Sequence, residues 1–174
     1  FSTVDPSLDN PIRQMFEKEK STNREFVSLD PWQEAPATWS LTASNDYYGK
    51  FERTALVIRS GEGNKVATWV HPISEAGYYD VYVYLVRQRR GFGPGGPGGP
   101  GGRGGDDEVP GSYFYTVYHE DGVDEIEMQA ADFEAGWNLL GSFYLSGNEA
   151  KLTLSDKGGA QRVIADAVKW VKQR

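Results

Sequence analysis

The sequence predicts an all-β protein: an antiparallel β-sandwich, jelly-roll-like, with a short N-terminal helix and a long loop rich in glycine and proline. Apolar residues recur with period 2 from residue 26 onward, which is the spacing of half-buried strands. Turn signals such as Asp121-Gly122 separate most of these segments. Aromatic residues make up 13% of the 174 residues, a content that favours strands. Many short strands joined by tight turns indicate a sandwich rather than alternating strands and helices.

Residues 1–30 are predicted to be an extension outside the sandwich. Asn10-Pro11 supplies a helix N-cap and a proline at the first helical position, and Ile12, Met15 and Phe16 form a short apolar stripe. A short helix is therefore expected there. It either packs across one end of the sandwich as part of a linker or docks a neighbouring domain.

Residues 31–174 are predicted to form one sandwich domain, because the chain length suits a single core. Strands are expected at residues 26–29, 37–42, 54–59, 65–71, 78–87, 113–119, 123–129, 138–145, 149–155 and 162–171. The last of these segments contains good helix formers, but its apolar side chains divide between two faces at period 2. We therefore expect one strand that is covered on both sides.

Residues 91–109 are predicted to be an insertion between two strands. Glycine occupies every third position from Gly93 to Gly105, as in collagen, but the run is too short for a triple helix. The run also matches G-x-G-x-x-G, yet its prolines prevent the helix that a dinucleotide site requires. We expect a flexible, tolerated loop, with a partner-binding arm as the alternative.

Composition excludes several partners and sites. The formal net charge of -7 repels nucleic acid, and no apolar run approaches the ~20 residues that a membrane helix needs. There is no cysteine, so the fold is not a disulfide framework. We assign no cofactor and no metal ligand, and the polar start of the chain suggests a mature or excised piece of a longer protein.

No catalytic signature is found, and the protein is not expected to be an enzyme. His119 is expected at the edge of the core and His71 in a similar place. Paired carboxylates could serve a glycosidase, but the acidic residues from Asp121 to Glu127 alternate along a hairpin as solvent-facing residues do. Asp166 lies within an apolar strand, so it is predicted to be structural and to accept hydrogen bonds from backbone, Tyr or Trp donors.

Four aromatic residues are predicted to form a binding platform. The strand before the glycine-rich loop has a natural core phase that leaves Tyr82 and Tyr84 outside, and the strand after it sends Phe114 and Tyr118 outward. If these two strands pair across the loop, the four rings lie together. Sugar rings stack on such surfaces through their C–H faces. Alternatively, the rings only stabilise the sheet as cross-strand pairs.

An ordered set of short motifs carries a family resemblance. The motifs are Ala67-Thr68-Trp69, Ala76-Gly77-Tyr78-Tyr79-Asp80-Val81-Tyr82-Val83, Tyr115-Thr116-Val117-Tyr118-His119, Asp121-Gly122, Gln129, Trp137-Asn138-Leu139-Leu140-Gly141-Ser142-Phe143, Leu152-Thr153-Leu154-Ser155 and Ile164-Ala165-Asp166-Ala167-Val168. In this order, over roughly residues 32 to 172, they resemble the golvesin C-terminal-like, or xanthan lyase carbohydrate-binding-like, domain. Residues 1–30 and the Gly/Pro tract depart from the family pattern.

The resemblance implies a non-catalytic, carbohydrate-binding-like accessory module of a larger exported bacterial protein. It would be secreted or lie at the cell surface or in the periplasm, with polysaccharide or neighbouring domains of the parent protein as partners. The alternative is a structural or protein-interaction module of a cell-surface assembly that binds no sugar. The resemblance carries over no binding residue. It explains Trp69 and Trp137 as core residues and Asp166 as an internal hydrogen-bond hub.

Overall fold

A computed structural model describes residues 35–86, 111–129, 132–146 and 148–174. The predicted helix, the strand at 26–29 and the Gly/Pro tract lie outside the described residues. Within them the all-β prediction is confirmed, since every regular element is a strand and all three sheets are antiparallel. The strands are β1 (Ser40–Ala43), β2 (Thr54–Arg59), β3 (Val66–Pro72), β4 (Gly77–Leu85), β5 (Ser112–His119), β6 (Gly122–Gln129), β7 (Gly136–Leu145), β8 (Glu149–Ser155), β9 (Arg162–Ala165) and β10 (Val168–Lys172).

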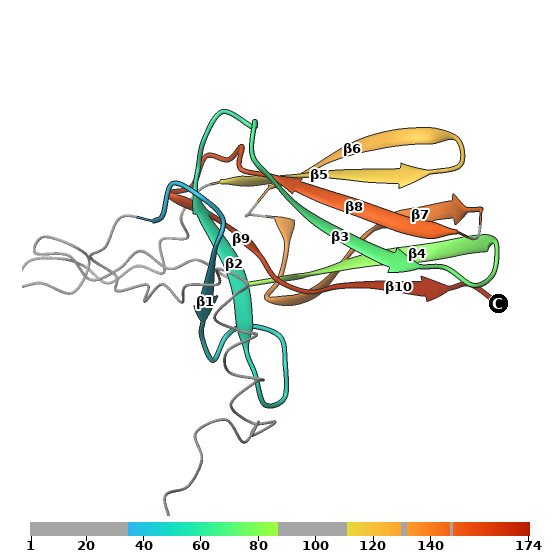
Figure 1. Cartoon of the computed structure of the whole chain (residues 1–174), viewed down its shortest axis with the longest axis horizontal. Coiled ribbons are helices and arrows are strands. Elements are labelled where there is room, and N and C mark those ends of the chain that lie inside the picture. The colour runs from blue at the N-terminus through green and yellow to red at the C-terminus, as the bar shows by residue number, and fades with distance from the viewer. Residues whose placement is uncertain (1–34, 87–110, 130–131, 147) are drawn as a thin grey trace, which may run out of the picture.

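Two of the three sheets form the layers of the sandwich. One has the strand order β3-β8-β5-β6 and the other the order β10-β4-β7. The third sheet, β1-β2-β9, lies at one end of these layers, as Figure 1 shows. The chain thus places β4 and β5, which flank the Gly/Pro tract in sequence, in different layers.

The main core fills the space between the two layers. Alternate residues of β4 point into it, and Val81, Val83 and Leu85 are almost completely buried. Leu152 and Leu154 of β8 meet them from the other sheet. Burying a side chain of this kind stabilises the fold by about 1.5–3 kcal/mol. The alternation that the sequence predicts for β4 is therefore the alternation that builds the core.

The central strand of the third sheet, β2, is buried on both faces. Ile58 of β2 joins the main core, whereas its neighbour Val57 belongs to a second cluster with Tyr47 and Ile164. Both residues of β2 are fully buried. Burial on both faces accounts for the continuous apolar run of this strand.

The segment 162–171, predicted as one strand, is two strands in two sheets. β9 pairs with β2, and β10 pairs with β4. The break falls at Asp166, whose carboxylate and backbone carbonyl accept hydrogen bonds from Tyr48 and from the Trp69 indole, both at 3.0 Å. The chain leaves one sheet there and enters the other. Periodicity alone does not reveal the break.

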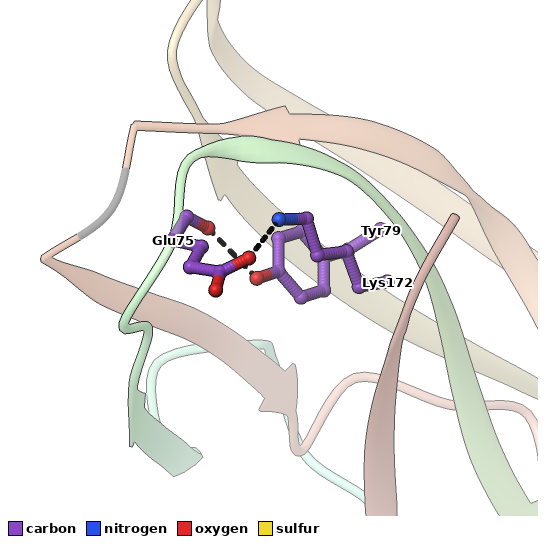
Figure 2. Close-up of polar contacts among 3 residues, drawn as sticks. All are labelled: Glu75, Tyr79 and Lys172. Atoms are coloured by element: carbon purple, nitrogen blue, oxygen red, sulfur yellow. Dashed lines mark hydrogen bonds and ion pairs between the residues drawn. The ribbon is translucent and has the colours of Figure 1, made fainter. Parts of the chain in front are cut away.

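The end of β10 is fastened to the turn that precedes β4. The Lys172 ammonium group pairs with the Glu75 carboxylate, and the Tyr79 hydroxyl donates to the Glu75 carbonyl oxygen at 2.8 Å (Figure 2). Hydrogen bonding to Lys172 lowers the pKa of Glu75, and the same bond raises the pKa of Lys172. This contact joins the end of the edge strand β10, which is held mainly by its pairing with β4, to the preceding turn.

Candidate functional site

One face of the β10-β4-β7 sheet points away from the core and carries exposed apolar side chains. We call it the outer face and define it by Tyr78, Asp80, Tyr82, Tyr84, Trp137, Leu139, Ser142, Tyr144, Lys169 and Val171. The members on β4 alternate with the buried core residues of that strand. The members on β7 and β10 pair across the strands with these β4 residues. Tyr78 is 56% exposed, Leu139 52% and Val171 44%. An apolar surface of this kind, on a sheet layer, is a typical binding surface.

A β-bulge places two of these residues on the outer face. Val81 pairs with Gly141 but Tyr82 pairs with Leu139, so Leu140 is an extra residue in β7. Leu140 packs against the core, and the residues before it change face relative to those after it. Trp137 and Leu139 therefore lie on the outer face beside Tyr84 and Tyr82.

Three rings pack together at one end of the outer face. Tyr84 and Trp137 are cross-strand neighbours whose ring centroids lie 5.4 Å apart at 82°. Tyr48, from the loop between β1 and β2, lies 4.9 Å from Trp137 and 5.4 Å from Tyr84. Tilted and edge-to-face contacts of this kind are the preferred arrangement of aromatic rings. We call these three residues the aromatic cluster.

The loop that carries Tyr48 is held by contacts on both sides. The Tyr48 N–H donates to the Asp166 carboxylate at 3.0 Å, and the neighbouring Tyr47 is buried in the second core. Arg53 donates from Nε to the Gly49 carbonyl oxygen at 3.1 Å. Gly49 has φ of 137°, and a Cβ there would lie 2.0 Å from the Glu52 carbonyl oxygen, so the turn requires glycine.

Asp166 joins this loop to the sandwich, as the predicted hydrogen-bond hub would. Its carboxylate receives the Tyr48 N–H, and its carbonyl oxygen receives the indole N–H of Trp69. Burial raises the pKa of Asp166, and the backbone hydrogen bonds from Tyr48 and Ala167 partly oppose that rise. The hub thus connects the aromatic cluster to β3 of the opposite sheet.

Lys169 lies over two rings of the outer face. Its ammonium nitrogen is 4.6 Å from the centroid of Tyr82, its cross-strand partner, and 4.4 Å from the centroid of Trp137. Both distances are within the range of cation–π attraction. Lys169 therefore supplies a positive charge at the end of the outer face that carries the aromatic cluster.

A polar group follows along the same face. The Asp80 carboxylate accepts hydrogen bonds from the Ser142 hydroxyl and, at 2.7 Å, from the Gln173 amide. These two bonds lower the pKa of Asp80. Beyond them lie Tyr78 and Tyr144, with ring centroids 5.3 Å apart. The face thus has aromatic residues at both ends and hydrogen-bonding groups in the middle.

The four predicted platform residues do not lie together. Tyr82 and Tyr84 are on the outer face of β4, but Phe114 and Tyr118 belong to β5 in the other sheet. The expected pairing of these two strands is wrong, because β4 pairs with β7 and β10, and β5 pairs with β6 and β8. A single platform of four rings is therefore not formed.

Phe114 and Tyr118, which belong to the opposite sheet, each lie under a lysine. Lys157 is 4.3 Å from the ring centroid of Phe114, and Lys151 is 4.3 Å from that of Tyr118. Phe114 also lines a groove of about 480 Å³. Other residues that line the groove are Glu62, Val66, Thr116, Glu125, Glu127 and Lys157. The carboxylates of Glu125 and Glu127, considered for glycosidase chemistry, are exposed there.

The two predicted core tryptophans differ in position. Trp69 is partly exposed and packs against the main core, as expected for an architectural residue. The prediction that Trp137 is a core residue is wrong, because the bulge at Leu140 places this side chain on the outer face, where it is partly exposed. Counting at period 2 back from the buried Phe143 places Trp137 inside, so the sequence could not reveal its position without the bulge.

The histidines lie in packing contacts. His71 stacks on Trp170 with centroids 5.8 Å apart, and His119 lies 5.3 Å from Phe143 with Nε2 3.4 Å from an Asp124 carboxylate oxygen. Among the described residues, no three His, Cys, Asp or Glu side chains gather as metal ligands would. Within the same ranges no helix is long and apolar enough to cross a membrane.

Comparison with known proteins adds no family. The sequence matches no protein-family model, and no curated protein matches it. The likeness to the golvesin C-terminal-like domain therefore stays a prediction from the motifs. The candidate site rests on the geometry of the outer face.

Proposed function

We propose that this protein is a non-catalytic, carbohydrate-binding-like accessory module of a larger exported bacterial protein. We assign polysaccharide binding to the outer face of the β10-β4-β7 sheet. The observation that carries the proposal is the grouping of Tyr82, Tyr84 and Trp137 at one end of an exposed sheet face, next to hydrogen-bonding groups.

The chemistry of this face suits a sugar. A pyranose ring has apolar C–H faces and a rim of hydroxyl groups, so it needs an aromatic surface and nearby polar atoms. Tyr82 and Trp137 supply the surface, and the Asp80 carboxylate with the Ser142 hydroxyl supplies acceptors and donors. Both requirements are met on adjacent strands.

The length of the face suits a chain rather than a single sugar. Tyr78 and Tyr84 are six residues apart on β4, which corresponds to about 20 Å at 3.3 Å per residue. Aromatic contacts lie at both ends of this length. An extended polysaccharide would contact the Tyr78–Tyr144 pair and the aromatic cluster at once.

The loop between β1 and β2 supports the site before any ligand arrives. Tyr48 is held against Trp137 by its hydrogen bond to Asp166 and by the buried Tyr47 beside it. A ring that is already fixed loses little conformational freedom on binding, which favours affinity. No residue of this face is assigned a catalytic role.

The proposal is tested by titrating the whole chain with a panel of neutral and acidic polysaccharides in a calorimeter. Tyr82→Ala and Trp137→Ala are expected to weaken binding roughly fivefold or more, since one ring contact is worth about 1 kcal/mol. Phe114→Ala and Tyr118→Ala are the matched controls, because they remove rings from the opposite sheet.

Two results would overturn the proposal. A loss of affinity confined to Phe114→Ala and Tyr118→Ala would move the site to the other sheet. Binding to none of the polysaccharides would favour the second function, a structural or protein-interaction module of a cell-surface assembly. That function would use the same exposed residues, because exposed apolar side chains on a sheet face also bind proteins.

A further inference from the structure

The Lys169 ammonium group lies over the rings of Tyr82 and Trp137, at the end of the outer face that carries the aromatic cluster. Lys169 lies on β10 directly across from Tyr82, and the bulge in β7 places the Trp137 ring on the same face, within reach of the lysine. Its ammonium nitrogen is 4.6 Å and 4.4 Å from the two ring centroids. Two rings therefore fix the position of a charge that a flexible lysine would otherwise spread over a large volume.

This ammonium group has no anionic partner in the described part of the chain. An ammonium has three N–H donors, and the rings accept none of them as ordinary hydrogen bonds. No carboxylate of residues 35–86, 111–129, 132–146 or 148–174 forms an ion pair with Lys169. The carboxylate of the outer face, Asp80, is bound instead by Ser142 and Gln173.

The overall negative charge of the chain contrasts with the positive charge of Lys169 on the outer face. The chain has a formal net charge of -7, so its long-range field repels acidic polymers. A preference for an acidic ligand would therefore depend on a positive charge within the site. Lys169 is such a charge, and it lies beside the rings on which a sugar would stack.

We infer that the outer face recognises acidic polysaccharides, in which a ring carboxylate pairs with Lys169 while the sugar stacks at Tyr82 and Trp137. The inference rests on the proposed function and names the ligand class of the same site. The carboxylate accepts hydrogen bonds from the ammonium group, and the neighbouring hydroxyls are left for Asp80 and Ser142. Binding of this kind forms and breaks no covalent bond.

The experiment compares polymers that differ only in charge. The whole chain is titrated with polygalacturonate, alginate and hyaluronan, and with the ester of each, which keeps the backbone and removes the charge. At least one acid form is expected to bind roughly tenfold more tightly than its ester, because a hydrogen bond to a charged group contributes about that much.

Variants locate the source of the preference. Lys169→Gln is expected to reduce the affinity for the acid form to that for the ester, and Lys169→Arg is expected to keep the preference because the charge remains. The matched control is Lys151→Gln, which removes a lysine that also lies 4.3 Å over a tyrosine ring, but on the opposite sheet. Thermal unfolding checks that each variant is folded.

The outcomes separate this inference from the proposed function. Equal affinity for acid and ester, or a preference that survives in Lys169→Gln, would overturn the inference and leave polysaccharide binding in place. Binding to none of the six polymers, nor to any neutral one, would overturn both. A preference lost in Lys169→Gln and kept in Lys151→Gln would support the inference.

Discussion

At the scale of single residues, Asp166 links the fold to the candidate site. Its carboxylate holds the Tyr48 backbone, its carbonyl oxygen holds the Trp69 indole, and it marks the point where the chain changes sheets. The sequence predicts its structural role because a carboxylate inside an apolar run must find donors. The identity of the donors could not be predicted, since Tyr48 lies 118 residues away in the chain.

Asp166 should give the protein a stability that falls as the pH rises. Burial raises the pKa of this carboxyl above the ordinary 3.8, so the folded protein keeps a proton that the unfolded chain has released. The folded state then binds more protons, and the free energy of unfolding decreases from about pH 4 upward until the raised pKa is passed. The phenols that interact with Asp166, Tyr47 and Tyr115, stay neutral in this range because burial raises both pKa values.

Asp166→Asn removes this titration while an amide oxygen can still accept the Tyr48 N–H. Relative to the wild type, the variant is expected to gain stability from about pH 4 upward until the raised pKa of Asp166 is passed, as measured by urea unfolding at several pH values. Asp121→Asn, at an exposed turn, is the control. A difference between Asp166→Asn and wild type that does not change with pH would contradict this account.

At the scale of elements, the strand pattern could be predicted and the irregularities could not. The positions of β2 to β8 follow from the spacing of their apolar residues and from the turn residues between them. The break after β9 and the bulge in β7 do not follow, since each depends on contacts from distant segments or on one extra residue. The bulge alone explains why Trp137 lies outside although counting from Phe143 places it in the core.

The loop between β1 and β2 gives a sharp test at this scale. Gly49→Ala would place a Cβ 2.0 Å from a backbone oxygen at a φ of 137°, so it is expected to destabilise the protein by about 1–3 kcal/mol. It should also weaken any ligand that uses Tyr48, as titration would show. Gly122→Ala is the control, because its φ is 133° but nothing lies within 4 Å of the new Cβ. Equal losses in the two variants would mean that the contact with Glu52 is unimportant.

At the scale of the whole molecule, the two layers depend on one shared core. Leu152 is fully buried between the sheets and pairs with Trp69 of β3 and Val117 of β5. Leu152→Ala is expected to lower the free energy of unfolding by about 2–5 kcal/mol, measured with chemical denaturant. Val123→Ala, at a half-exposed position of β6, should change it little. A loss below about 1 kcal/mol for Leu152→Ala would contradict this packing.

Only part of the candidate site can be predicted from the sequence. Alternation along one strand predicts that Tyr82 and Tyr84 face outward, and the structure places both on the outer face. Their neighbours Tyr48, Trp137 and Lys169 come from three other segments, which only the sheet topology brings together. The same topology separates Phe114 and Tyr118 from them.

The most direct test of the central claim is a map of the bound ligand. Backbone amide chemical shifts of the whole chain would be recorded while an oligosaccharide from a bound polymer is added. The chemical-shift changes are expected to concentrate on β4, β7 and β10 around Tyr82, Trp137 and Lys169. Changes concentrated on β5 and β6 around Phe114 would contradict it.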